Sequence, residues 1–559
     1  TTDQQHRTHS TLKSRSYSSP VLPRPCFSSL LTSVMSIEEK VQPLPEVNIL
    51  TFLTLNDVYE TAKINSKGGL AEMSTLIKRE RLAAKDDCER RHVLLTVNGD
   101  FMSASAAAFK HKGQHCIDVF HYMGVDMVVP GNHEFDFGDE VLEERIQESN
   151  FTWLCCNIVK KSDGSLFNGM VGTMIQQYGS VKIGFLGLCT KETPSISYPG
   201  EDTVFSDVIP AAQTAVKQLL ADGAEVLVAL THLRLKEDTL LATRVPQLDL
   251  ILGGHDHLPY TTMKGKTLIH KCGQNAYWLG RVDMRITVTT TADRRRVNVS
   301  YGWKMISNMD DTVRPDPECV ELIRKWVPLE DELSASGVDM VLLSHDLDSR
   351  TAICRQQQCT FGCLVADSLR EFFHTDIGVI NGGFIRGDCM YERGSSFTTA
   401  DLQRELPFPS GAVAIRIKGK DILHAFEQQL KTLPNPTGSF PQLSAACLRY
   451  DPSRKPGQRV LDVTVYDRKT QQMLPLQPEQ EYTVACTSFM HGGGDGITAL
   501  RNGTLISEEG LDLPVRDCVE AFLHGKPAIS YGPNEVAERS VILLHNVDDT
   551  RSSIDLERV

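Results

Sequence analysis

The sequence predicts a layered α/β protein, and three features support this fold class. Short apolar runs alternate with amphipathic segments from residue 48 to about residue 260. Each apolar run ends in polar residues, as in sheets whose ligands bind beyond the strand ends. A second block, from residue 340 to about residue 545, again mixes helical and strand patterns. Because 559 residues exceed what one hydrophobic core usually serves, we expect more than one domain.

Six apolar runs of the first block predict strands. They are VNILTFLTL (47–55), HVLLTVNGD (92–100), VDMVVPGNHE (125–134), VKIGFLGL (181–188), AEVLVALTHL (224–233) and LDLILGGHDH (248–257). Helical patterns lie between several of these runs, for example at 68–85 and 206–223. Residues 280–303 alternate in polarity like a hairpin, which would close the first domain.

The second block follows a charged stretch at 315–336 that begins with proline and predicts a connecting helix. Beyond it, 421–430 predicts a helix, whereas 459–467 and 481–489 predict strands. The expected organisation is given by five ranges: a segment outside either core (1–44), a first domain (45–305), a linker helix (306–336), a second domain (337–545) and a polar tail (546–559).

The first 44 residues are rich in Ser, Arg and Pro, and acidic residues are almost absent between Asp3 and Glu38. This composition fits a transit peptide, and it also fits sequence upstream of a start at Met35. We favour the second interpretation slightly, because the first convincing strand follows Met35 closely. Neither interpretation gives this segment a core to fold around.

Composition excludes some classes of partner. A net charge of -13 argues against a nucleic-acid backbone, whose phosphates need a basic face. No run of 18 or more apolar residues predicts a membrane span. The adjacent Cys155 and Cys156 follow an apolar strand pattern and favour a reducing compartment, so a cytoplasmic location is expected. Glycosylation patterns at Asn150, Asn298 and Asn502 argue the other way and keep a secreted or organellar location open.

Polar residues at the predicted strand ends form the main candidate site. They are Asp57 and Tyr59 in NDVY, Asp100 in NGD, Asn132 and His133 in GNHE, His232 in THL, and His255 and His257 in GGHDH. One histidine after an apolar run is more often structural than a ligand. Several strand ends that each carry Asp, Asn or His are much more specific.

These residue types suit a centre with two divalent cations. Two such cations, about 3.5 to 4 Å apart, need a carboxylate that bridges them, with imidazole and oxygen donors that leave positions open. Asp100 is the natural bridge. Such a pair of cations lowers the pKa of a shared water and holds a phosphoryl group for in-line attack.

Through GD, GNHE, a lone His and GHDH in the same order, residues 48–260 resemble the calcineurin-like metallophosphoesterases. The resemblance implies a four-layer α/β/β/α sandwich. It also implies two divalent metal ions, from among Mn, Zn, Mg, Co and Fe. One metal would be held by Asp57, Asp100 and His257. The other would be held by Asp100, Asn132, His232 and His255. His133 would face the phosphate as the catalytic residue, and Asp136 would orient its ring.

Tyr59 departs from this pattern, because the nucleotidase branch of the family normally has a histidine at this place. A neutral phenol is a poor ligand unless a strongly acidic metal binds it. Tyr59 could ligate an oxidised iron, leave one metal with fewer protein ligands but working, or mark a pseudoenzyme. Since every other ligand is present, we rank the second alternative first and the pseudoenzyme last.

The second block resembles the smaller α+β substrate-binding domain of 5'-nucleotidases, which extends the resemblance to about residue 510. The matching motifs are CRQQQC, NGGFIR, LPFPSG and SFMHGGGDG. The residues that they would contribute to substrate binding are Arg355, Asn381, Arg386, Phe408, Phe489 and Asp495. In this family, arginines hold phosphate, an Asp binds ribose hydroxyls and two phenylalanines enclose the base. The chemistry agrees, because guanidinium groups suit phosphate and aromatic faces suit flat rings.

We therefore expect a dimetal phosphomonoester hydrolase, most simply a 5'-nucleotidase whose partner is a small-molecule phosphoester, a nucleotide. The resemblance further implies rotation of the second domain about the linker. Two alternatives stay open: a phosphatase for a phosphosugar or phosphoglycerate derivative, or a cyclic-nucleotide phosphodiesterase. A catalytically silent nucleotide-binding protein is the alternative from another class.

Overall fold

The computed structural model describes residues 46–64, 67–85, 90–291, 294–309, 312–327, 338–408, 410–506, 513–532, 536 and 539–542. The expected segments 1–44 and 546–559 lie outside these residues, as does Met35.

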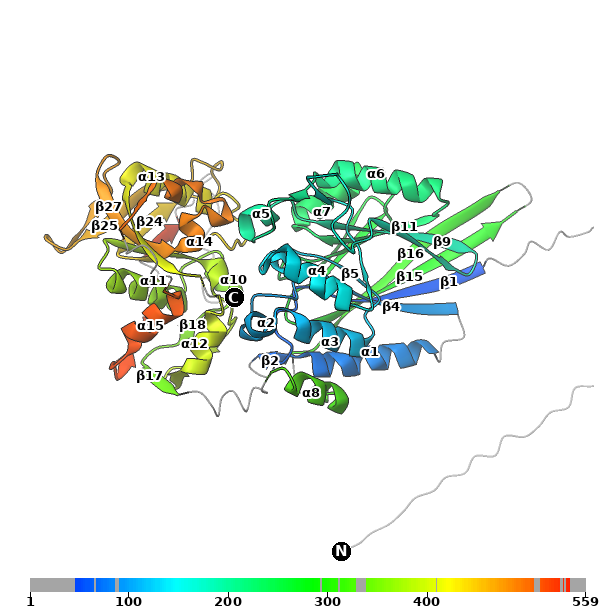
Figure 1. The fold of residues 1–559 in the computed structure, drawn as a ribbon, viewed down its shortest axis with the longest axis horizontal. Coiled ribbons are helices and arrows are strands. Elements are labelled where there is room, and N and C mark those ends of the chain that lie inside the picture. Colours follow the sequence, from blue (N-terminus) through cyan, green and yellow to red (C-terminus); the bar gives the residue numbers. More distant parts are fainter. Residues whose placement is uncertain are drawn as a thin grey trace, which may run out of the picture. The chain divides into compact units, whose positions relative to one another are not determined.

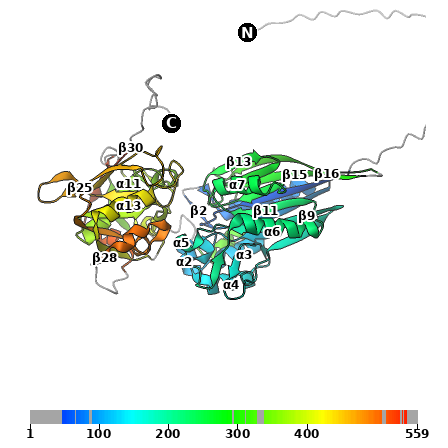
Figure 2. The same ribbon diagram turned by 90° about the horizontal axis from the view of Figure 1, so that it is seen from above.

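The first sheet has six strands, in the order β16-β15-β1-β4-β5-β6. Their bounds are Arg295–Ser307 (β16), Trp278–Thr290 (β15), Glu46–Leu55 (β1), Arg90–Asn98 (β4), Met127–Val129 (β5) and Thr152–Trp153 (β6). β1, β4, β5 and β6 run parallel, whereas β15 is antiparallel to β1 and β16. The long β15–β16 hairpin, expected from the alternating pattern, is visible in both ribbon views (Figures 1 and 2).

The second sheet also has six strands, in the order β13-β14-β12-β11-β9-β8. Their bounds are Pro259–Lys264 (β13), Thr267–Cys272 (β14), Leu250–Gly253 (β12), Val226–His232 (β11), Val181–Cys189 (β9) and Thr173–Tyr178 (β8). The four inner strands are parallel, and the edge strands β13 and β8 are antiparallel. The sequence predicted β9, β11 and β12, but it gave no signal for the half-exposed edge strands.

The two sheets pack face to face through alternate residues. On β1, Leu50 and Phe52 point into the core between the sheets, and Leu53 points to the opposite face. On β11, Val228 faces the first sheet and Ala229 faces the helices. This period of two follows from the pleat of a strand, and it explains why runs buried on both faces are apolar throughout.

Helices cover the outer face of each sheet and complete the predicted α/β/β/α sandwich (Figure 1). The first sheet is covered by α1 (Leu70–Lys85), α3 (Gln114–Met123), α4 (Gly138–Glu148) and α8 (Pro317–Arg324). The second is covered by α6 (Val208–Ala221) and α7 (Leu235–Arg244). Shorter elements of this half are β2 (Lys63–Ile64), β3 (Lys67–Gly68), α2 (Ala106–His111), η1 (His133–Phe135), β7 (Ile158–Lys160), α5 (Thr193–Ile196) and β10 (Thr203–Phe205).

The linker differs in part from the helix expected over 306–336. β16 continues to Ser307, because its pairing with β15 extends to Trp278. The described helix, α8, is shorter and buries Cys319 and Ile323 in the core that α1 shares. This segment therefore packs on the first domain, and residues 328–337 lie outside the described ranges. The exact domain boundaries stay a prediction.

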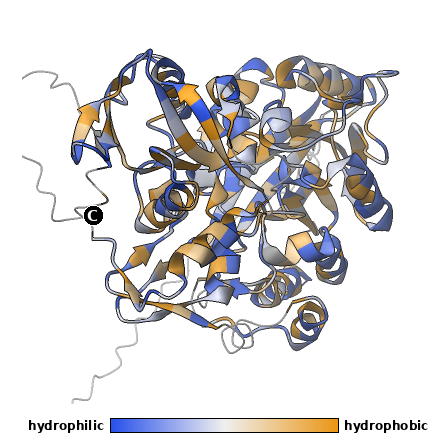
Figure 3. Cartoon of the chain, turned by 60° about the vertical axis from the view of Figure 1, so that its left-hand side comes forward, coloured by the Kyte–Doolittle hydropathy of each residue, from blue (hydrophilic) through white to orange (hydrophobic). Residues whose placement is uncertain are grey.

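The second block is built on a five-stranded sheet in the order β23-β19-β27-β22-β28. Its strands are Pro441–Ser444 (β23), Ile377–Asn381 (β19), Glu481–Thr487 (β27), Ala412–Lys418 (β22) and Thr504–Leu505 (β28). One face packs on α11 (Thr360–Phe372) and α15 (Val515–Leu523), and the other packs on α13 (Gly419–Gln429). Hydropathy colours change along the helices, as expected when one side of each is buried (Figure 3).

Smaller sheets and helices complete this block. They are β17 (Asp339–Leu343), β18 (Leu347–Asp348), α10 (Thr351–Cys354), η2 (Gly382–Phe384), β20 (Met390–Tyr391), β21 (Ser396–Thr398), α12 (Thr399–Glu405), β24 (Ala446–Tyr450), β25 (Val460–Asp467), β26 (Gln472–Pro475), α14 (Ser488–His491), η3 (Gly494–Gly496), η4 (Thr498–Asn502), β29 (Ala528–Ile529) and β30 (Ser540–Ile542). None of the helices that the structure describes has the length and apolar character needed to cross a membrane.

Candidate metal centre and phosphate site

Three of the predicted ligands have a left-handed backbone. Asp57, Asp100 and His255 have φ values of 53°, 59° and 73°. Each follows the end of a parallel strand, where a residue with positive φ turns the chain sharply. This conformation is uncommon for residues other than glycine, and its clustering at one place is typical of functional sites.

Glycines beside these ligands let the strand ends come together. A Cβ atom on Gly131 would lie 2.2 Å from Asp100 Oδ1, and one on Gly254 would lie 2.0 Å from the Asn98 carbonyl oxygen. Only a hydrogen fits at either position. The glycines of GNHE and GGHDH are therefore explained by close packing of the loops.

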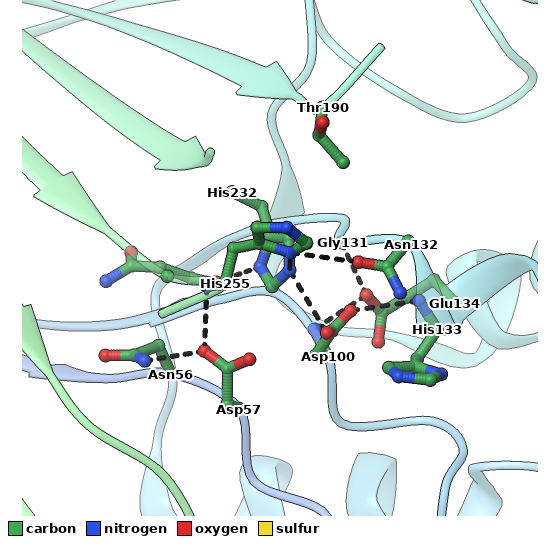
Figure 4. Close-up of polar contacts among 12 residues, drawn as sticks. Asn56, Asp57, Asp100, Gly131, Asn132, His133, Glu134, Thr190, His232 and His255 are labelled. Atoms are coloured by element: carbon green, nitrogen blue, oxygen red, sulfur yellow. Dashed lines mark hydrogen bonds and ion pairs between the residues drawn. The ribbon is translucent and has the colours of Figure 1, made fainter. Parts of the chain in front are cut away.

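The first cluster gathers Asp100, His232, His255 and Asn132 (Figure 4). His232 Nε2 lies 3.1 Å from Asp100 Oδ2 and 3.2 Å from His255 Nδ1. His255 Nδ1 is also 3.1 Å from Asn132 Oδ1. The other ring nitrogen of His232 lies 2.8 Å from the Asn98 carbonyl oxygen, which fixes the ring and leaves Nε2 for the site.

The second cluster gathers Asp57, Tyr59 and His257 beside the same Asp100. The Tyr59 hydroxyl lies 3.0 Å from Asp57 Oδ1, 3.2 Å from Asp100 Oδ2 and 2.9 Å from His257 Nε2. His257 Nε2 is 3.4 Å from Asp57 Oδ1. Asp100 Oδ2 thus belongs to both clusters, which is the position that a bridging carboxylate needs.

These spacings fit two divalent cations. Ligand atoms about 2.1 Å from one ion are about 3.0 Å apart in octahedral geometry and about 3.4 Å apart in tetrahedral geometry. The donor atoms of both clusters are spaced in this range, and the donor set of carboxylate, imidazole and amide oxygen suits such ions. The structure therefore brings all seven predicted ligands together, and their individual ligand roles stay a prediction.

The electrostatics of the first cluster favour a cation. Burial acts to raise the pKa of Asp100, but the neighbouring histidines outweigh it and hold this pKa well below its usual value. Burial acts to lower the pKa of His232, but Asp100 raises it to about 9. A site that keeps carboxylates ionised and draws protons onto imidazole has a negative potential, which a metal cation would neutralise.

His257 and Tyr59 respond differently to burial. Burial and the nearby Arg355 lower the pKa of His257 to about 4, so its ring is neutral and can ligate. Burial, followed by Asp57 and Asp100, raises the pKa of Tyr59 well above its usual value. The phenol is therefore neutral here. The structure places its hydroxyl at ligand spacing, and the three alternatives for Tyr59 stay open.

His133 lies beside the clusters and is bonded to a carboxylate. Its Nδ1 lies 2.7 Å from Asp136 Oδ2, and Asp136 also accepts hydrogen bonds from Ser103 and Ser197. Burial acts to lower the pKa of His133, but Asp136 and Asp100 outweigh it and raise this pKa. Because Asp136 occupies Nδ1, the ring has Nε2 left for a substrate oxygen.

Sequence reasoning missed Glu134, the last residue of GNHE. This buried carboxylate accepts hydrogen bonds from the backbone N–H groups of Asp100 at 2.8 Å and Gly131 at 2.5 Å. It also accepts from Phe101 and Met102. Glu134 therefore ties the GD loop to the GNHE loop. An acidic residue inside an otherwise assigned motif was the signal that could have identified it.

Two predicted phosphate-binding arginines reach this centre. The Arg386 guanidinium carbon lies 4.2 Å from the centre of the Tyr59 ring, and Nη2 of Arg386 has no hydrogen-bond partner in the described structure. Burial and the nearby charge of Arg386 lower the pKa of Arg355. Two adjacent, half-buried guanidinium groups repel each other unless an anion lies between them. They suit the phosphate of a substrate.

The other predicted substrate-binding residues do not all lie together. Asn381 Nδ2 donates to Asp495 Oδ2 at 2.7 Å, so these two form one polar pair. Phe408 stacks on His133 with ring centres 6.4 Å apart, and it also contacts Phe384. Phe489 packs against the core on the α13 face of the five-stranded sheet in the second block. Among the described aromatic contacts, none joins Phe408 to Phe489, so the base sandwich stays a prediction.

Comparison with known proteins supports the same two-part organisation. The calcineurin-like phosphoesterase model matches residues 50–259, and the model of the 5'-nucleotidase C-terminal domain matches residues 340–502. The chain is 28% identical to the 5'-nucleotidase of Bos taurus over 505 residues, which cover 82% of this chain and 86% of the bovine protein.

Two solved structures share the fold. A 5'-nucleotidase precursor from Thermus thermophilus matches with a TM-score of 0.77 and 24% identity, over 89% of this chain and 99% of that chain. A sulfate thiohydrolase from the same organism matches with a TM-score of 0.71 and 16% identity, over 89% of this chain and 97% of that chain. The second match shows that this fold also occurs with another chemistry. With both family models matched in order, the chain belongs to the 5'-nucleotidase family, with a calcineurin-like phosphoesterase domain followed by a 5'-nucleotidase C-terminal domain.

Proposed function

We propose that this protein is a 5'-nucleotidase that uses two divalent cations to release phosphate from nucleoside 5'-phosphates. One observation carries the proposal: Arg386, from the second block, lies over Tyr59 at the edge of the metal centre with Nη2 unpartnered in the described structure. A phosphate that lies between the two arginines, Arg355 and Arg386, and the two ligand clusters would accept hydrogen bonds from the guanidinium groups. The same phosphate would lie beside the cations.

The chain's own residues would prepare the phosphoester for hydrolysis. When bound, the cations would activate a water for in-line attack and polarise the phosphoryl oxygens. Arg355 and Arg386 would hold the phosphate oxygens opposite the cations, because a guanidinium group can donate two parallel hydrogen bonds. Asp100 would keep the two cations together, since one of its oxygens borders both clusters.

His133 would stabilise the leaving oxygen. Its raised pKa favours the imidazolium, which can donate a proton or a charged hydrogen bond from Nε2. Asp136 keeps the ring in this orientation, and the two serines keep Asp136 in place. Ser103 and Ser197 would therefore support catalysis through Asp136.

The nucleoside would be recognised by the second block. Asp495 is half-buried, and its side chain bonds to Asn381, so a sugar diol would find an acceptor and a donor side by side. Phe408 offers an aromatic face beside His133, which suits a flat ring close to the phosphate. Phe489 would supply the second face after a change in its side-chain position.

A panel of phosphoesters tests the proposal. The purified chain is assayed with Mn, Mg, Zn and Co on nucleoside 5'-monophosphates, a phosphosugar, a phosphoglycerate and a cyclic nucleotide. We expect the highest kcat/KM with a nucleoside 5'-monophosphate. Preference for a substrate without a base would contradict the nucleotidase proposal. Bound metal without turnover on any ester would instead favour a silent nucleotide-binding protein.

A further inference from the structure

A buried lysine outside the predicted ligand set lies directly behind the metal centre. Lys271 is on β14, is fully buried and extends its amine toward the loops at the ends of β11 and β12. Its Nζ lies 2.9 Å from Asp238 Oδ2 and 2.6 Å from Asp256 Oδ2. A lysine with no exposed surface is rare, and two carboxylates beside it make the burial tolerable.

The lysine also contacts the backbone of both ligand loops. Nζ donates to the Leu233 carbonyl oxygen at 2.5 Å and to the Gly254 carbonyl oxygen at 2.8 Å. Leu233 directly follows His232, and Gly254 directly precedes His255. One amine therefore joins the two segments that supply neighbouring ligands to the first cluster.

Asp256 strengthens this link from within GGHDH. Its Oδ2 accepts from Lys271 and from the Leu235 backbone N–H at 2.6 Å. Asp256 lies between His255 and His257, so a fixed Asp256 restrains both histidines. His255 needs such restraint, because its left-handed backbone with φ of 73° is unfavourable for a histidine.

A glycine in the ligand loop leaves space for this lysine. A Cβ atom on Gly253 would lie 2.9 Å from Lys271 Cε, so the first glycine of GGHDH provides space for the lysine stem. Asp238, on α7, is in turn bonded by Thr231 at 2.7 Å. The buried cluster thus connects three elements: β14, the start of α7 and the loop that carries His255.

We propose that Lys271, acting through Asp256 and the Gly254 carbonyl, is a positioning residue that preorganises the metal centre. It holds His232 and His255 at ligand spacing before a cation binds. Supporting groups of this kind typically change metal affinity by about 10- to 100-fold. The inference rests on the proposed dimetal function, but it is tested by metal affinity and not by turnover.

Three variants of the full chain test the role. Asp256→Asn removes the negative charge that anchors the loop to Lys271 and keeps the Lys271–Asp238 ion pair. Lys271→Met keeps an unbranched side chain the length of the lysine stem and removes every donated bond. Lys266→Met is the matched control, because Lys266 is on the loop before the same strand, is half exposed and pairs with Asp249 at 2.7 Å. Affinity for Mn and Zn is measured by competition with a chelator, and folding is followed by circular dichroism.

We expect Asp256→Asn and Lys271→Met to lower metal affinity by about 10- to 100-fold and Lys266→Met to leave it unchanged. At saturating metal, KM for a phosphoester should stay close to the wild-type value, because the substrate arginines are untouched. Unchanged metal affinity in the folded variants would overturn the proposal. Failure of both variants to fold where Lys266→Met folds would also overturn it, in favour of a purely structural ion pair. A wild-type chain that binds cations but cleaves no nucleotide would contradict the proposed function alone.

Discussion

The two halves of the active centre are prepared for their ligands in opposite ways. At the strand ends of the first block, Asp57, Asp100 and His232 are almost completely buried and bond to neighbouring ligand side chains. In the second block, buried polar atoms of Arg355 and Arg386 lack hydrogen-bond partners in the described structure. In the first half the ligand atoms bond to one another, and Nδ1 of His257 is the one ligand nitrogen recorded there without a partner among the described residues, whereas in the second half guanidinium donors themselves lack partners.

This difference reflects the size of the ligand. A cation of about 1 Å radius can enter between donors that are already in place, and it replaces the bonds that hold them. A phosphate brings several acceptor oxygens of its own, so its donors must be left free. Each unsatisfied buried group costs about 1 to 3 kcal/mol, which substrate binding would recover. The first half should therefore control metal affinity, and the second should control substrate affinity.

Asp100→Asn should give the largest effect and would break the first half. Because Asp100 Oδ2 borders both clusters, an amide there would weaken both metal positions and lower kcat/KM by more than about 100-fold. Metal content and turnover are measured together. The exposed Asp202→Asn serves as the control. Wild-type turnover in the Asp100 variant would refute the bridging assignment.

Arg386→Ala should impair substrate binding by the second half without impairing metal binding by the first. Truncating a half-buried charged donor that contacts substrate costs about 2 kcal/mol, which corresponds to about a 30-fold loss in substrate affinity. Metal affinity should not fall, since the described contact of Arg386 with this centre is with the Tyr59 ring and the loss of a positive charge near His257 cannot weaken the binding of a cation. Substrate kinetics and chelator competition are compared, with the exposed Arg416→Ala as control. A parallel loss of metal affinity would mean that the halves are not separate.

Asp136→Asn alters a residue of the first half and should shift the pH profile of the activity. Because the pKa of His133 is raised, its ring stays protonated to a higher pH than an ordinary histidine does. Activity that needs this proton should therefore fall as the pH rises through the raised pKa. Removing the Asp136 charge should move this alkaline limb to lower pH and reduce kcat by about tenfold. Rate profiles against pH measure the shift. An unmoved limb would assign it to another group, and Asp139→Asn is the nearby control.

Tyr59 lies where the halves meet, and changing it should give the smallest effect. Tyr59→His should raise metal affinity by up to about tenfold, because imidazole ligates better than a phenol whose pKa is raised. Tyr59→Phe keeps the ring beneath Arg386 and removes only the hydroxyl. Titration of both variants with Mn and Zn separates these contributions. A large loss of affinity in Tyr59→Phe would show that the hydroxyl is itself a ligand.

Local patterns predicted much of the sandwich and the candidate ligands. Strands β1, β9, β11 and β12 are apolar on both faces, and such runs can be recognised without knowing their partners. The half-exposed edge strands β8 and β13 gave no comparable signal. Of the linker helix expected over 306–336, residues 306 and 307 belong to β16 because they pair with β15, α8 covers Pro317–Arg324, and residues 328–337 lie outside the described ranges.

By itself the sequence determined where several strands lie along the chain and which Asp, Asn and His residues stand at their ends. The alternation of apolar and amphipathic segments and the chemistry of single residues are local properties. Only the tertiary structure decided which of these atoms meet, since parallel strands far apart in the chain bring their ends to one place. It also decided the roles of Glu134 and Lys271. Their importance comes from the loops that they join, and those distances exist only after folding.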